Sequence, residues 1–168
     1  MAPTIAMVNF AIKLKPKFVC IVPENRREIT TEGGLNLSQK NLRILINKLK
    51  KNNIEVSLFI NPSIKDIRKS DKLGADAIEI HTGSFAKSIK AKNKNKKIYE
   101  FNKIKKCKLE CDKTKMKFNL GHGLDYQSIK YLNKIKNINE YNIGHFIIGE
   151  SLFDGFPKVI KKFKRLIR

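Results

Sequence analysis

Residues 75–83 read Ala-Asp-Ala-Ile-Glu-Ile-His-Thr-Gly, an apolar run that contains one carboxylate and ends in a histidine and a glycine. Similar short runs rich in Val, Ile and Phe recur along the chain, each followed by polar or glycine-containing residues. Near-continuous apolar runs are typical of strands that are buried on both faces, as in parallel sheets. We therefore predict five strands, at 17–23, 55–60, 75–80, 115–120 and 141–148.

Amphipathic stretches alternate with these strands and predict helices at 37–51, 63–73, 98–106, 128–134 and 156–167, with a further helix over 4–14. Ser38 and Ser63 are candidate N-caps, and the lysine-rich 90–97 is expected to be a solvated loop or a frayed helix. Alternating strands and helices indicate right-handed βαβ units and a parallel sheet.

The number of units narrows the fold class. A complete (β/α)8 barrel needs about 250 residues, whereas this chain has 168. Five βα units preceded by a helix without its strand fit an α/β fold: a partial TIM barrel that corresponds to strands 4–8. We expect residues 1–168 to form one such partial domain. A flavodoxin-like five-stranded sheet is the competing architecture.

The net charge of +21 raises the possibility of a nucleic-acid partner. However, the chain has 30 Lys and 6 Arg, and no aromatic residues are interleaved with the lysine runs. Nucleic-acid readers rely on arginine for its bidentate geometry. Lys, Asn and Ile are all in excess, which indicates an AT-rich genome, and we expect no nucleic-acid partner.

The compartment follows from what the chain lacks. No run approaches the roughly 20 apolar residues of a membrane span, and the opening residues do not have the pattern of a secretory signal. Cys20, Cys107 and Cys111 make an odd number of cysteines, and the last two have no histidine nearby. We expect reduced, structural thiols and a cytoplasmic protein.

Three histidines mark the candidate site. His81, His122 and His145 all fall at or beyond the C-terminal part of a predicted strand, the edge where ligands bind in α/β folds. His122 lies between two glycines, and an imidazole there can exchange a proton near neutral pH. For the other two, an ordinary surface role is as plausible. A three-histidine metal site lacks the usual carboxylate or close spacing, so we expect no metal.

Other residues at the same edge favour a phosphate ligand. Gly123 follows the fourth predicted strand, and Gly144 and His145 lie within the last one, near the corner where barrels commonly bind phosphate. Glu79 is a carboxylate within an apolar strand, where it either serves the reaction or pairs with a lysine. The loop that contains Thr30 offers hydroxyls and a double glycine, which suit a ligand contact and a simple turn equally well.

At these residues the sequence resembles the pyridoxine 5′-phosphate synthase family. The matching segments are long, and with the spacers between them the resemblance covers the whole chain. They are KPKFVCIVPENRREITTEGGLN (15–36), IEVSLFI (54–60), GADAIEIHTG (74–83), GHGL (121–124) and YNIGHFIIGESLFDG (141–155).

The resemblance implies an enzyme that condenses 1-deoxy-D-xylulose 5-phosphate with 3-amino-2-oxopropyl phosphate to form pyridoxine 5′-phosphate in vitamin B6 biosynthesis. It implies a cytoplasmic homo-octamer and no metal or organic cofactor. By position, His122 resembles the proton donor and Glu79 the carboxylate that stabilises the transition state. Thr30 resembles the contact to the deoxyxylulose phosphate, and Gly123, Gly144 and His145 resemble contacts to the second substrate.

The chain also departs from the family pattern. Leu120 stands where the family usually has alanine, and the first residues match a segment that follows a catalytic glutamate on the third strand. That glutamate, a second catalytic histidine and three strands are then absent. We expect the chain alone to be inactive and poorly soluble, with unpaired edge strands beside an uncovered apolar interior, unless a companion chain supplies the missing part. The alternatives are a phosphate-binding protein without catalysis and, less favoured, a basic nucleic-acid binder.

Overall fold

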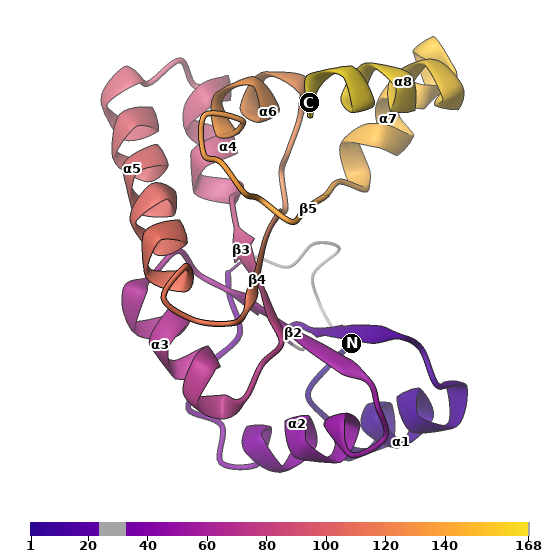
Figure 1. Ribbon diagram of the computed structural model, residues 1–168. Coiled ribbons are helices and arrows are strands. Elements are labelled where there is room, and N and C mark those ends of the chain that lie inside the picture. Colours follow the sequence, from indigo (N-terminus) through magenta and orange to yellow (C-terminus); the bar gives the residue numbers. More distant parts are fainter. Residues whose placement is uncertain (24–32, 168) are drawn as a thin grey trace.

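The computed structural model describes residues 1–23 and 33–167, and its described strands form one parallel sheet (Figure 1). The strands are β1 (Phe18–Ile21), β2 (Glu55–Ile60), β3 (Ala77–His81), β4 (Lys117–Gly121) and β5 (Glu140–Asn142). The helices are α1 (Ile5–Leu14), α2 (Leu42–Lys50), α3 (Ile64–Leu73), α4 (Gly83–Lys90), α5 (Lys94–Cys111), α6 (Tyr126–Leu132), α7 (His145–Asp154) and α8 (Phe156–Leu166).

Strand order decides between the two predicted architectures. The order is β1-β2-β3-β4-β5, and every neighbouring pair is parallel. Each crossover therefore advances in the same direction, as in a barrel, whereas a flavodoxin-like sheet places its first strand between the second and third. The five strands form a half-barrel, which confirms the predicted α/β fold class.

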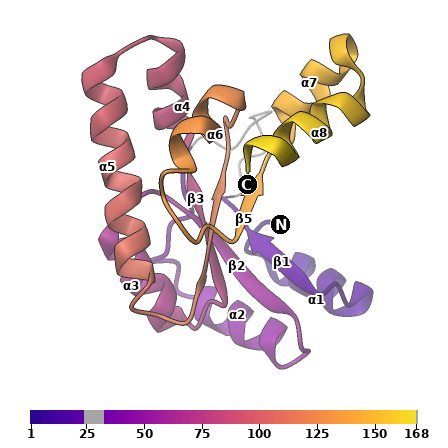
Figure 2. The same cartoon turned by 45° about the horizontal axis from the view of Figure 1, so that its top comes forward.

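The outer face of the sheet forms the hydrophobic core. The helices lie around this face from α1 and α2, through α3 and α5, to α4 and α6 (Figures 1 and 2). The strand residues that point toward them are at most 1% exposed, and burial of each contributes roughly 1.5–3 kcal/mol. They are Ile21, Val56, Leu58, Ile60, Ile78, Ile80, Phe118 and Leu120.

The inner face of the sheet is mostly polar. Residues in register on neighbouring parallel strands point to the same face, so the inner side chains form rows across the sheet. One row is Cys20, Ser57, Ala77 and Lys117; the next is Phe59, Glu79, Asn119 and Glu140; the last is His81, Gly121 and Asn142. The predicted apolar interior is therefore wrong, although β1 and β5 do lie at the two edges.

Several predicted elements differ from the structure. The strand predicted at 141–148 is wrong beyond Asn142, because α7 begins at His145. Helix α4 was not predicted, and α5 begins at Lys94, within the segment expected to be a loop or frayed helix. Ser63 caps α3 by accepting a hydrogen bond from the backbone of Asp66. Asn41, not Ser38, precedes α2.

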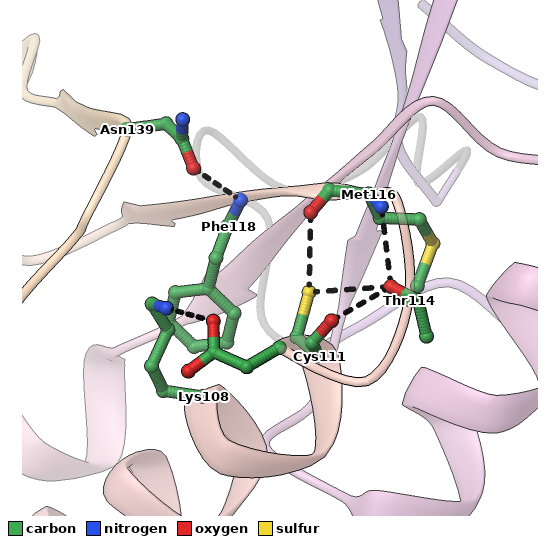
Figure 3. Close-up of polar contacts among 7 residues, drawn as sticks. Lys108, Cys111, Thr114, Met116, Phe118 and Asn139 are labelled. Carbon is green, nitrogen blue, oxygen red and sulfur yellow. Dashed lines mark hydrogen bonds and ion pairs between the residues drawn. The ribbon is translucent and has the colours of Figure 1, made fainter.

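The connection from α5 to β4 is held by side-chain contacts with the backbone (Figure 3). Thr114 Oγ1 donates to the carbonyl oxygen of Cys111, and the Cys111 thiol lies 3.5 Å from the carbonyl oxygen of Met116. Asn139 Oδ1 accepts from the backbone N–H of Phe118 at 2.8 Å, which ties the segment before β5 to β4. Cys107 and Cys111 are buried free thiols, as their predicted structural role requires.

Lys108 is a buried cation that makes this region sensitive to mutation. Lys108 is 5% exposed; its ammonium contacts Asp112 and lies 5.9 Å from the ring centroid of Phe118. We expect Asp112→Ala to lower the free energy of unfolding by about 1–3 kcal/mol, because a buried ammonium loses its partner. Lys108→Met is expected to be neutral or stabilising. Urea unfolding of both variants checks this, and equal losses would contradict it.

Candidate active site

A cavity of about 390 Å³ opens at the C-terminal edge of the sheet, on its inner side. Thr30 lies outside the described residues, but all the other predicted site residues line this cavity. They are Glu79, His122, Gly123, Gly144 and His145. Residues separated by up to 66 positions in sequence therefore meet in one place. Phe59 and Asn142, which were not predicted as site residues, line the cavity as well.

Glu79 lies in the middle row of the inner face and is held by two neighbours. Asn142 Nδ2 donates to Glu79 Oε2 at 2.6 Å, and the Cys20 thiol lies 3.7 Å from the same oxygen. Burial raises the pKa of Glu79, while these two hydrogen bonds lower it and the nearby Glu140 raises it. Among the residues that the structure describes, no lysine pairs with Glu79, so they do not form the alternative ion pair.

Cys20 is a thiol at neutral pH. Its burial, together with the charge of Glu79, raises the pKa of Cys20 to about 12. Because the thiolate is the reactive form of cysteine, Cys20 cannot serve as a nucleophile at this pH. Its contact with Glu79 makes it a hydrogen-bond donor to the carboxylate.

His81 and His122 form a close pair of tilted rings. Their ring centroids are 4.6 Å apart with an angle of 32° between the planes, and Phe59 presents its edge to His81 at 5.4 Å. Gly83 leaves room for this pair, because a Cβ there would lie 2.8 Å from His81 Cε1 and 3.0 Å from His122 Cδ2. Gly83, two residues after His81, is thus needed for the two imidazole rings to lie side by side.

The backbone at His122 is strained. His122 has φ 72° and Gly123 has φ 75°, so both occupy the left-handed region. For a residue with a side chain this conformation costs on the order of 1–3 kcal/mol, and such strain concentrates at functional sites. Thr82 stabilises the turn: its Oγ1 lies 2.8 Å from the carbonyl oxygen of Gly121 and 2.7 Å from that of His122. The imidazole is thereby presented to the cavity from a fixed backbone.

Thr82→Val is a direct test of this anchor. Thr82 is 1% exposed, and valine has nearly the same shape without the hydroxyl. We expect the substitution to lower the free energy of unfolding by about 1–3 kcal/mol, since the carbonyl of His122 loses its hydroxyl donor, whereas the carbonyl of Gly121 keeps the backbone N–H of residue 82. Thermal unfolding measures this effect. Ser88→Ala is a matched control, because the Ser88 hydroxyl donates to Phe85 within α4 and is remote from the turn. An equal loss in both variants would contradict a special role for Thr82.

Gly144 and His145 differ in structure from the prediction, although both reach the site. Gly144 is the N-cap of α7 and His145 is the first residue of that helix, so neither lies in a strand. The first turn of α7 contains no acidic residue. Its backbone N–H groups have no partner within the helix, and the helix dipole favours negative charge at this end. The cavity therefore has one wall suited to an anion.

The three histidines do not form a metal site. Within residues 1–23 and 33–167, no three His, Cys, Asp or Glu side chains are arranged to hold a metal ion. His81 and His122 pair with each other, while His145 belongs to α7. In the same part of the chain, no helix is long and apolar enough to cross a membrane.

Comparison with known proteins decides the family. The sequence profile of the pyridoxal phosphate biosynthesis protein PdxJ matches residues 1–168. The chain belongs to the PdxJ family. It is 48% identical to pyridoxine 5′-phosphate synthase of Pelagibacter ubique (strain HTCC1062), over 95% of this chain and 67% of the relative. It is 42% identical to the synthase of Blochmanniella floridana, over 100% of this chain and 68% of the relative. The chain thus spans about two thirds of the length of these PdxJ relatives.

Solved structures agree on the fold of this PdxJ family member. The chain matches the structure titled "Native KDPGal structure" with a TM-score of 0.62 at 10% identity, over 99% of this chain and 68% of that chain. It matches the citrate synthase SbnG with a TM-score of 0.59 at 12% identity, over 98% and 69%. At such identities the likeness concerns the fold alone.

Proposed function

We propose that this chain carries part of the active site of a pyridoxine 5′-phosphate synthase, which acts in vitamin B6 biosynthesis; alone, the chain is expected to have little activity. The reaction condenses 1-deoxy-D-xylulose 5-phosphate with 3-amino-2-oxopropyl phosphate. The observation that carries the proposal is the convergence of Glu79, His122 and the Gly144–His145 helix start on one cavity, in a chain 48% identical to a synthase. The free thiols of Cys20, Cys107 and Cys111 suit the cytoplasm, where these substrates would be met.

The phosphate of 3-amino-2-oxopropyl phosphate is assigned to Gly123, Gly144 and His145. The first-turn N–H groups of α7 and the His145 side chain supply donors. Gly123 permits the left-handed turn that follows His122, where a Cβ would lie 3.2 Å from Ala86 Cβ. A Cβ at Gly144 would meet nothing within 4 Å, so the space there is open to a ligand. Thr30, outside the described residues, is assigned to the phosphate of the other substrate.

His122 is assigned the role of proton donor. The condensation eliminates water and inorganic phosphate while closing an aromatic ring, so leaving groups must be protonated. An imidazole titrates near neutral pH and can supply that proton. The neighbouring His81 ring and the Thr82 anchor keep the His122 side chain in one orientation.

Glu79 is assigned the stabilisation of positive charge that develops on the substrate. Its carboxylate lies in a cavity wall with Asn142 as its hydrogen-bond donor, and it makes no ion pair with a lysine of residues 1–23 and 33–167, although Lys90 lines the same cavity. A half-buried charge such as this one interacts more strongly with an opposite charge than it would in water. The cost to the fold of burying the carboxylate is consistent with a functional reason for its presence.

The test is to incubate the purified chain with both substrates and to follow pyridoxine 5′-phosphate by its fluorescence after chromatography. Formation of the product that is lost in His122→Asn would support the proposal. Asparagine tolerates the left-handed backbone, so this variant removes the imidazole with little added strain. Binding of pyridoxine 5′-phosphate without any turnover would favour the alternative of a phosphate-binding protein. If the chain showed neither turnover nor binding, both the synthase and the phosphate-binding alternative would be overturned.

An oligomer is the second part of the proposal, and α7 is the surface that favours it. Ile148, Leu152, Phe153 and Phe156 are 54–89% exposed on α7 and at the start of α8, and no α7 residue is buried. Contiguous apolar surface of this kind marks protein contacts. We expect Leu152→Ser with Phe153→Ser to shift the chain toward smaller species in sedimentation velocity. Ile44→Ser, which removes another exposed side chain on α2, is the control. An unchanged distribution would contradict this interface.

A further inference from the structure

A second binding region lies outside the candidate active site, between α4, α5 and α6. Two cavities of about 300 and 310 Å³ adjoin there and share Lys94, Lys97 and Tyr131 in their linings. Helix α4 separates this region from the candidate active site: Lys90 lines the active-site cavity, whereas Phe85 lines the second region. Each volume is within the range of small-molecule sites.

The walls of the region combine apolar rings with lysines. Phe85 and Phe101 lie with their ring centroids 6.3 Å apart at its floor, and the side chain of Ile98 is 56% exposed beside them. The lysines that line the two cavities are Lys92, Lys94, Lys97 and Lys134. Of the described residues that line them, none is acidic.

These lysines are not neutralised by the protein. Elsewhere on the surface Lys50 pairs with Asp76, and Lys117 pairs with Glu55. By contrast, none of the four lysines of this region is within ion-pair distance of a carboxylate in the described part of the chain. The first turn of α5, which includes Lys94, also contains no acidic residue. Positive charge is unfavourable at that helix end, so an anion would relieve the repulsion.

Tyr131 is the centre of the region. Lys97 Nζ donates to the Tyr131 hydroxyl at 3.0 Å and lies 4.2 Å from the ring centroid, and Lys134 Nζ lies 5.5 Å from the same centroid. Two ammonium groups thus converge on one ring beside an apolar floor. A lysine ammonium has three donors, so Lys97 can bind an anion while it keeps its bond to Tyr131.

We propose that this region binds a nucleoside phosphate, with the base on the Phe85, Phe101 and Tyr131 side and the phosphate among Lys92, Lys94 and Lys97. An aromatic base matches the apolar floor, and base-to-aromatic contacts contribute substantially to nucleotide binding. The phosphate matches a cluster of lysines without carboxylates. A ligand with both parts fills both adjoining cavities, which neither part does alone.

The test is calorimetric titration of the chain with AMP in about 0.15 M salt, which screens general attraction to the positive surface. Ribose 5-phosphate and adenosine are the comparison ligands. The proposal expects AMP to bind at least about tenfold more tightly than either fragment, because each engages half of the region. Equal affinity for AMP and ribose 5-phosphate would overturn it, since the lysines alone would then account for binding.

Matched variants locate the binding. Lys97→Gln is expected to weaken AMP binding about tenfold or more, whereas Lys96→Gln removes the same charge one residue away, outside both cavities, and is expected to have little effect. Tyr131→Leu is likewise expected to weaken AMP binding, whereas Tyr99→Leu, which alters a tyrosine outside both cavities, is expected to have little effect. His145→Ala is expected to leave AMP binding unchanged; loss of AMP binding there would place the ligand in the candidate active site and overturn the proposal. Failure of pyridoxine 5′-phosphate synthesis would not affect this result.

Discussion

Replacing Glu79 with glutamine is expected to lower the rate of pyridoxine 5′-phosphate formation by about 10²–10⁴-fold in the assembly in which this chain is active. Glutamine has nearly the same shape, and its amide oxygen can still accept the hydrogen bond from Asn142 Nδ2. The change therefore removes the negative charge while leaving the packing in place. Initial rates at saturating substrate measure the effect. A rate within about threefold of the unaltered chain would contradict the role assigned to Glu79.

The same substitution is expected to stabilise the fold at neutral pH. Burial raises the pKa of Glu79 above its ordinary 4.5, so the folded state favours the protonated carboxyl group. This contribution to stability is fully present below the unfolded pKa and is lost as the pH rises through the folded pKa. Glutamine does not titrate. Urea unfolding should therefore show little difference between the two proteins near pH 4 and a growing advantage for Glu79→Gln toward pH 7.

A gain in stability with a loss of rate would separate function from structure. If the carboxylate of Glu79 served only to stabilise the fold, its neutralisation would lower the free energy of unfolding of the chain. An advantage for the unaltered chain at pH 7 would mean that Asn142 and Cys20 more than compensate for the burial of Glu79. The pH series therefore distinguishes the two explanations without depending on the activity of the chain.

The fold was predictable where burial alone determines the structure. The predicted strand at 55–60 coincides with β2, because its apolar residues are covered by helices on one side and by neighbouring strands at its edges. The strand predicted after Asn142 is wrong because contacts with distant elements, and not local apolarity, determine the structure of this segment. It is apolar enough for a strand, but Phe146 packs against Tyr126 and Phe163, with ring centroids 4.9 and 5.9 Å away. Contacts with α6 and α8, which the local sequence does not reveal, make this segment a helix.

For the candidate site, the sequence predicts which residues lie together but not which partners hold them. The position of His122 directly after a predicted strand places it at the sheet edge, and the position of Glu79 within a strand predicts a side chain that points inward near the same edge. Their partners were not predictable, because strand register determines them: Asn142 reaches Glu79 across β4. The signal for Thr82 was present in the sequence, since a threonine directly after a strand-end histidine is well placed to bond a neighbouring turn. Only the spatial pairing of β3 with β4 identifies that turn as the one at His122.

Gly121→Ala is expected to destabilise the chain by about 1–3 kcal/mol and to abolish binding of pyridoxine 5′-phosphate. A Cβ at this position would lie 1.8 Å from Glu79 Oε1 and 2.6 Å from Glu79 Cδ, distances that no relaxed structure contains. To make room, the carboxylate would have to turn aside and give up its hydrogen bond from Asn142 Nδ2 at 2.6 Å. Denaturant unfolding and fluorescence titration with pyridoxine 5′-phosphate measure the two effects.

A double-mutant cycle identifies the clash as the cause. Glu79→Ala removes the atoms that the new methyl group would meet, so Gly121→Ala should cost much less in that background, with a coupling energy of about 1 kcal/mol or more. Gly149→Ala is the control for adding a methyl group, since a Cβ there meets nothing within 4 Å. In the middle of α7 it should stabilise the chain by about 0.5–1 kcal/mol. Additive losses in the cycle would mean that backbone strain at the Gly121–His122 turn, rather than the carboxylate of Glu79, requires glycine at position 121.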